Sequence, residues 1–230
     1  MSNYSLRRRF GNKRTMMTMI FLIIQIVLFL LMTIMGGSTN VFTLIRFGAK
    51  FNPAILAGEF WRLITPIFLH IGFTHILLNS VTLYFLGSQL EIIYGNLRFA
   101  IIYLMGGIMG NAMSFAFSDA VSAGASTSLF GLFAATIVLG RLYPHNYAIR
   151  DMAQGFTVLI ILNFIAGLTS GSVDNWGHLG GAIGGALGAM VVPIPNMAVV
   201  EKSTRIKMLL VFILLLAIFI GFRFVYYGML

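Results

Sequence analysis

Three apolar segments of this sequence begin with polar side chains that could take part in catalysis. One carries an imidazole and an amide, the second a run of hydroxyls, and the third another imidazole. In chain order they are THILLNS with His75 and Asn79, ASTS with Ser126, Thr127 and Ser128, and NWGHLGG with His178. A hydroxyl, an imidazole and an amide donor are the nucleophile, general base and oxyanion stabiliser of serine acyl transfer.

The residues that other hydrolytic mechanisms require are missing from these segments. Six acidic residues are present, and none falls in the middle of an apolar segment, which argues against a pair of catalytic carboxylates. An H-E-x-x-H pattern, typical of zinc proteases, does not occur. The chain has no cysteine, which excludes a thiol nucleophile and disulfides. We therefore expect a site without a metal ion or a cofactor.

The spacing of the polar residues suits a hydrolytic site. Ser126 is expected at the N-terminus of a helix, where free backbone N–H groups and the helix dipole favour a developing oxyanion. Gly124 permits a tight turn into that helix. His75 and Asn79 are four residues apart, so both lie on one helix face.

A glycine pattern predicts how His178 could approach the hydroxyls. In GHLGGAIGGALGA, glycines fall at 177, 181 and 185 and again at 180, 184 and 188, which makes two ladders on adjacent strips of one helix. Small residues let helix backbones approach closely in a membrane. Close packing against the helix of Ser126 would bring the imidazole within hydrogen-bond reach of the hydroxyl. Asp174, one turn earlier, could orient it.

Each polar group also has a structural interpretation. The hydroxyls could cap and pack a helix, Asn79 could bond to a neighbouring helix, and His178 could be a packing residue. His70 is interpreted as a packing residue of a loop, and His145 as lying far from the site. The coincidence of these groups near the same end of three helices favours catalysis.

Composition and hydropathy predict an all-α fold, a polytopic transmembrane bundle of about seven helices. The chain of 230 residues is 59% hydrophobic and 9% charged, whereas soluble domains carry about 25% charged residues. Its apolar runs are long enough to cross about 30 Å of hydrocarbon. The expected helices are 16–36, 74–91, 97–117, 126–142, 153–170, 176–194 and 206–227.

The distribution of positive charge predicts an orientation in the cell membrane. Seven crossings place eleven of the 15 Lys and Arg residues on the side of the N-terminus, which the positive-inside rule assigns to the cytoplasm. The candidate catalytic groups then lie near the extracytoplasmic face. The net charge of +9 is explained by topology and anionic lipid headgroups, so we expect no nucleic-acid partner.

Four stretches of the sequence resemble the rhomboid intramembrane serine proteases of bacteria, in the order typical of that family. They are FWRLITPIFLHIGFTHILLNSVTLYFLG, LEIIYGNLRFAIIYLMGGIMGN, SAGASTSLFGLFAA and VDNWGHLGGAIGGALGA, and they span roughly residues 59–190. The resemblance implies a serine–histidine dyad, with Ser126 as nucleophile and His178 as general base. It also implies an oxyanion hole formed by His75, Asn79 and the backbone N–H of Ser126.

The resemblance extends to motifs outside the dyad. Trp61 and Arg62 resemble part of the family's membrane-embedded first loop, and LEIIYG resembles its E-x-x-x-G turn. One departure is Thr127, because the family often has glycine directly after the nucleophile. We hypothesise that this threonine narrows the pocket beside the nucleophile.

The expected organisation is a basic cytoplasmic segment over 1–15, a six-helix catalytic core over 16–195, and a linker with a seventh helix over 196–230. The expected activity is hydrolysis of peptide bonds in or near transmembrane segments of substrate proteins in the lipid bilayer, with substrate entry near 156–166. Two alternatives stay open: a catalytically inactive relative that binds transmembrane helices, and a small membrane transporter. The sequence carries no signal of oligomeric state.

Overall fold

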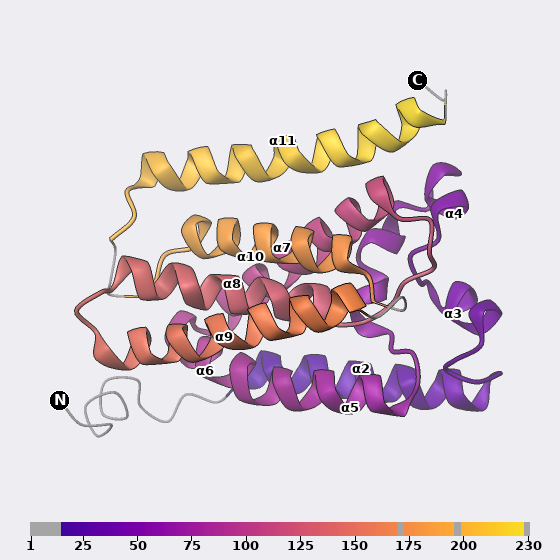
Figure 1. Ribbon diagram of the computed structural model, residues 1–230, viewed down its shortest axis with the longest axis horizontal. Helices are drawn as coiled ribbons and strands as arrows, with labels where there is room; N and C mark the ends of the chain where they lie inside the picture. The colour runs from indigo at the N-terminus through magenta and orange to yellow at the C-terminus, as the bar shows by residue number, and fades with distance from the viewer. Residues whose placement is uncertain (1–14, 170–172, 196–198, 228–230) are drawn as a thin grey trace.

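The fold is a bundle of long helices. A computed structural model describes residues 15–169, 173–195 and 199–227. One long rod in this part of the chain is continuous through three elements: α5 (Phe73–Thr82), the π-helical turn η3 (Leu83–Gly87) and α6 (Ser88–Tyr94). The other long helices are α2 (Met16–Ile34), α7 (Asn96–Phe117), α8 (Ser126–Leu142), α9 (Tyr147–Thr169), α10 (Asn175–Val191) and α11 (Lys202–Tyr226). These seven rods lie roughly parallel or antiparallel to one another in Figure 1.

The apolar segments predict these rods closely. Among the described residues, four helical segments are long and apolar enough to cross a membrane: α2, Phe73–Tyr94, α7 and α11. The helix expected over 153–170 is observed from Tyr147, because the Asn146 side chain accepts a hydrogen bond from the Ile149 N–H and begins the helix earlier. The expected helix over 176–194 ends at Val191, just before Pro193. The protein is therefore an integral membrane protein of helical architecture.

Helix α10 packs tightly between α7 and α8, and its two glycine ladders make this possible. On one strip, a Cβ atom added to Gly181 or Gly185 would overlap the backbone of α8 at Thr127 or Gly131. On the other strip, a Cβ atom on Gly180 would lie 2.7 Å from the Met109 carbonyl of α7. The absence of side chains thus sets the distance between the three backbones.

The long connection between the first two membrane helices folds into short helices. These are α3 (Val41–Phe47), α4 (Asn52–Leu56) and the 3-10 turns η1 (Phe60–Leu63) and η2 (Thr65–Phe68). Figure 1 places α3 and α4 at the end of the bundle where α5, α8 and α10 begin. The buried Arg62 holds this region together by donating to the carbonyls of Ile45 and Ala49 and to the carboxylate of Glu59.

Glu91, the first residue of the predicted E-x-x-x-G turn, stabilises the start of α2. Its buried carboxylate accepts hydrogen bonds from the N–H groups of Met17 and Thr18, at 2.7 and 2.8 Å, and from the Thr18 hydroxyl. A negative charge at a helix N-terminus satisfies free N–H groups and complements the helix dipole. Gly95 ends the turn with φ of +81°, where glycine is favoured.

Candidate active site

Ser126 is the first residue of α8, and the turn before it is held from two sides. Gly124 has φ of +152°, and its N–H donates to the carbonyl of Pro66 at 2.9 Å. The next N–H, of Ala125, donates to Nε2 of His70 at 3.4 Å. Residues of the first loop therefore fix the backbone that presents the hydroxyl of Ser126.

The three neighbouring hydroxyls have different surroundings. Thr127 is buried between α7 and α10, where its Cβ would meet a Cβ on Gly110 and its Cγ2 one on Gly177. Ser128 is also buried and lies against Gly107 of α7. Ser126 alone is partly exposed. The Thr127 side chain lies in the contact between α7 and α10, and its effect on the pocket beside the nucleophile stays a prediction.

His75 lies next to the turn that precedes Ser126. A Cβ atom on Gly124 would lie 2.9 Å from Nε2 of His75 and 3.5 Å from Oγ of Ser126, so both atoms border the same small space. Nδ1 of His75 accepts a hydrogen bond from the Ile71 N–H at 3.4 Å. In the neutral ring this leaves the proton on Nε2, which is then a donor facing that space.

Asn79 lies one turn after His75 on α5, as the spacing predicts. Its side chain is buried, and its amide nitrogen has no hydrogen-bond partner among the described residues. Buried polar groups in proteins are nearly always paired. An unpaired amide donor one helical turn after His75 is available to donate to a ligand oxygen.

The imidazole of His178 lies on the face of α8 that carries Ser126. It stacks on the ring of Phe130, with centroids 4.0 Å apart and an interplanar angle of 11°. Phe130 is four residues after Ser126, so the stack lies one helical turn below the hydroxyl. The imidazole is buried, and its Nδ1 has no partner among the described residues. Ser126 and His178 form no direct hydrogen bond in this part of the chain.

Asp174 positions the helix that carries His178. Its side chain accepts from the Gly177 N–H at 2.9 Å and from the Ser114 hydroxyl, and its backbone carbonyl accepts from the His178 N–H. Both side-chain contacts anchor the first turn of α10. Orientation of the imidazole by this carboxylate stays a hypothesis without a contact to support it.

His70 is a neutral structural residue. Burial, together with the nearby His75, lowers the pKa of His70 to about 3. Its Nε2 is then free to accept from Ala125 at neutral pH. This agrees with its interpretation as a packing residue of the loop.

Sequence reasoning missed two residues of this region. Phe130 could have been found from its position one turn after Ser126 on the same face of α8. Lys50 is one of the Lys and Arg residues that the seven predicted crossings place on the extracytoplasmic side, and it is completely buried beside the C-terminus of α7. No local pattern marks that burial.

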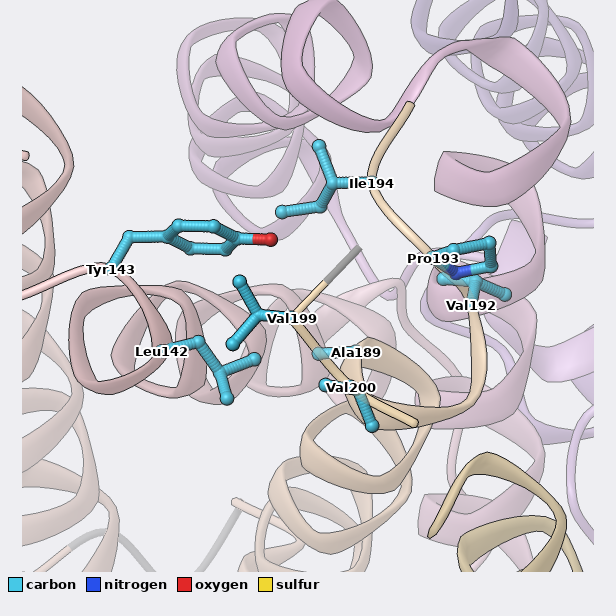
Figure 2. Close-up of a pocket in the computed structure, with 8 residues that line it drawn as sticks. All are labelled: Leu142, Tyr143, Ala189, Val192, Pro193, Ile194, Val199 and Val200. Carbon is cyan, nitrogen blue, oxygen red and sulfur yellow. The ribbon is translucent and has the colours of Figure 1, made fainter. Parts of the chain in front are cut away.

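A small cavity lies far from these residues. Figure 2 shows it at the opposite end of α8, where Tyr143 and Leu142 face Val199 and Ile194. Its volume of about 10 Å³ has room for one water molecule at most. It is too small for a peptide. Among the described residues, no group of three His, Cys, Asp or Glu side chains could hold a metal ion.

These observations define a polytopic helical membrane protein with hydroxyl, imidazole and amide groups gathered at one end of the bundle. Residues 57–195 match the Rhomboid domain family, and the chain therefore belongs to the rhomboid family.

Several curated proteins are similar to the chain. It is 41% identical over 220 residues to "Rhomboid protease GluP" of Bacillus subtilis (strain 168), which covers 96% of this chain and 42% of that protein. It is 36% identical over 149 residues to "Rhomboid-like protease 1" of Toxoplasma gondii, covering 62% of this chain and 50% of that protein. It is 33% identical over 139 residues to "Putative rhomboid protease YdcA" of Bacillus subtilis (strain 168), covering 60% and 69%. The chain thus spans half or less of the length of the first two relatives.

Proposed function

We propose that this protein is an intramembrane serine protease that hydrolyses peptide bonds in or near transmembrane segments of membrane-protein substrates. Family membership supports the reaction class, since two of the relatives above are named rhomboid proteases. The observation that carries the proposal is the common space bordered by Oγ of Ser126 and Nε2 of His75. The Asn79 amide, which has no partner among the described residues, lies one helical turn after His75.

The proposed reaction begins when His178 takes the hydroxyl proton of Ser126. The Ser126 oxygen then attacks the scissile carbonyl carbon, and the carbonyl oxygen becomes an oxyanion. The side chains of His75 and Asn79 and the backbone N–H of Ser126 donate hydrogen bonds to that oxyanion. Catalytic hydrogen bonds often tighten only when substrate binds, so a small movement of the imidazole is expected to complete the dyad.

The second half of the reaction releases both products. His178 gives its proton to the leaving amine as the carbon–nitrogen bond breaks, which leaves an acyl-enzyme on Ser126. A water molecule, deprotonated by His178, then attacks the ester carbonyl and frees the new carboxyl group and the Ser126 hydroxyl. No cofactor takes part in this scheme.

The charge distribution supports a topology for this reaction. We place the N-terminus and the basic segment 1–15 in the cytoplasm and the active site toward the extracytoplasmic face of the cell membrane. Water reaches the site from that face. We assign catalysis to the six-helix core 16–195, with 196–230 as an added linker and helix.

A direct test compares purified wild-type protein with Ser126→Ala and His178→Ala on a test substrate that has one transmembrane segment. We expect cleavage and labelling by a fluorophosphonate in the wild type, and loss of both in Ser126→Ala. Ser203→Ala, at an exposed position on α11, is the matched control and keeps full activity. Binding of the substrate without cleavage by the wild type would favour an inactive helix-binding relative, and solute flux in liposomes without cleavage would favour a transporter.

A further inference from the structure

A fully buried lysine lies close to the helix that carries His178. Lys50 stands between α3 and α4, has no exposed surface, and donates from Nζ to the carbonyls of Ser118 at 2.8 Å and Ser114 at 3.5 Å. These carbonyls belong to the C-terminal end of α7, where a positive charge complements the helix dipole. Backbone hydrogen bonds in both directions also pair Lys50 with Ser122 of the α7–α8 connection.

Ser114 connects this lysine to Asp174. Its carbonyl accepts from Lys50, while its hydroxyl donates to the carboxylate of Asp174, and Ser114 itself is completely buried. Asp174 in turn caps the N-terminus of α10 through the Gly177 N–H. Lys50 thus lies at the negative C-terminal end of α7, and Asp174 lies at the positive N-terminal end of α10. The electrostatic attraction between Lys50 and Asp174 acts between these two helix ends.

We propose that Lys50 is a positioning residue that acts through Ser114 and Asp174 to hold the first turn of α10, and with it the imidazole of His178, in place for catalysis. This inference rests on the proposed protease function. The His178 N–H bonds to the Asp174 carbonyl, so a shift of the carboxylate displaces the turn that bears the imidazole. Lys50 does not touch the reacting atoms in this scheme.

The proposal has a pH-dependent consequence. Burial lowers the pKa of Lys50 to about 8, while Asp174 acts to raise it and Arg223 to lower it. Among the described residues, these are the two charged groups that act on the pKa of the ammonium. Deprotonation of Lys50 above pH 8 removes the positive partner of Asp174, and cleavage activity is expected to decline there.

Loss of activity at that pH would not reflect unfolding caused by this group. The pKa of Lys50 is about 8 in the folded protein and 10.5 ordinarily, so the unfolded chain binds the proton more tightly between these values. Stability from Lys50 alone therefore rises with pH over that range. Activity and stability are expected to change in opposite directions.

The experiment measures kcat and KM for cleavage of the test substrate from pH 6 to 10 in full-length wild type, Lys50→Met, Lys50→Arg and Ser114→Ala. We expect kcat of Lys50→Met to fall about tenfold at pH 7, with little change in KM. Misplacing a catalytic group by 1 Å can cost about 10²-fold in rate, and loss of Lys50 is expected to shift the imidazole by less than that. The decline above pH 8 should disappear in Lys50→Arg, which keeps its charge. The matched control is Lys207→Met, an exposed lysine on α11, which should behave as the wild type.

The outcomes separate this inference from the proposed function. If the wild type cleaves nothing at any pH, the protease proposal itself fails. If the wild type is active but Lys50→Met keeps its kcat, the positioning role is refuted. An alkaline decline that persists unchanged in Lys50→Arg would also refute it, as would full additivity of kcat losses in the double variant Lys50→Met, Ser114→Ala. Circular dichroism and thermal unfolding of each variant show that the comparison is made on folded protein.

Discussion

The imidazole of His178 on α10 stacks on the phenyl ring of Phe130 on α8, with ring centroids 4.0 Å apart and an angle of 11° between the planes. This contact joins the helix of the proposed base to the helix of the proposed nucleophile, since Phe130 lies one turn after Ser126. The flat face of the Phe130 ring limits the tilt of the imidazole. The two ring nitrogens lie at the edge of the imidazole, away from the stacked face.

Removal of the stacking partner should therefore impair catalysis. Aromatic pairs contribute about 0.5–1.5 kcal/mol beyond area burial, so Phe130→Ala should lower kcat by roughly two- to tenfold, while Phe130→Tyr restores it. Phe99→Ala is the control, because Phe99 is buried on α7 and packs on Phe21 and Tyr103 rather than on Phe130 or the histidine. Equal kcat losses in both alanine variants would contradict an orienting role for Phe130.

Asn79 offers a second test, because its amide nitrogen has no hydrogen-bond partner to lose among the residues that the structure describes. Removing an oxyanion donor costs about 2.7–4 kcal/mol, so Asn79→Ala should lower kcat by about 10²–10³-fold with little effect on thermal stability. Asn111→Ala is the opposite case, since the Asn111 amide donates to the Leu63 carbonyl at 2.9 Å. That variant should lose stability and keep kcat. A large stability loss with unchanged kcat in Asn79→Ala would rule out the donor role.

The glycine ladders predict a sharp contrast between two identical substitutions. Gly181→Ala places a Cβ atom against the Thr127 carbonyl and should destabilise the protein by about 1–3 kcal/mol, the usual cost of overpacking. Gly221→Ala on α11 has open space around the added atom and should leave the unfolding midpoint unchanged or raise it. Unfolding in detergent, followed by circular dichroism, measures both. Similar midpoints for the two variants would argue against close helix contact at Gly181.

His70 predicts a loss of stability in acid. Its pKa is about 3 in the folded protein against an ordinary 6.5, so the unfolded chain binds the proton first as the pH falls below 6.5. The stability that the neutral ring contributes is present above pH 6.5 and is lost progressively toward pH 3. His70→Gln should show a shallower decline between pH 6.5 and 4 than the wild type. Parallel stability curves for the two proteins would contradict the burial of a neutral His70.

The sequence predicted the helical bundle because long apolar runs have no other stable arrangement in a bilayer. It also predicted that α10 would approach its neighbours closely, because glycines four residues apart leave one helix face without side chains and let another backbone pack against it. The helix boundaries were harder to predict. The start of α9 depends on one side chain, Asn146, that caps it.

Family resemblance and register singled out Ser126, but the sequence alone could not show how the three adjacent hydroxyls differ. Helix periodicity turns each successive side chain by about 100°, and only the positions of α7 and α10 decide which of them are buried. The same holds for Lys50, whose neighbours Ser114 and Asp174 are 64 and more residues away in the chain. Local sequence determined the helices and the types of groups at their ends, whereas contacts between distant segments decided which groups are buried, paired or left free.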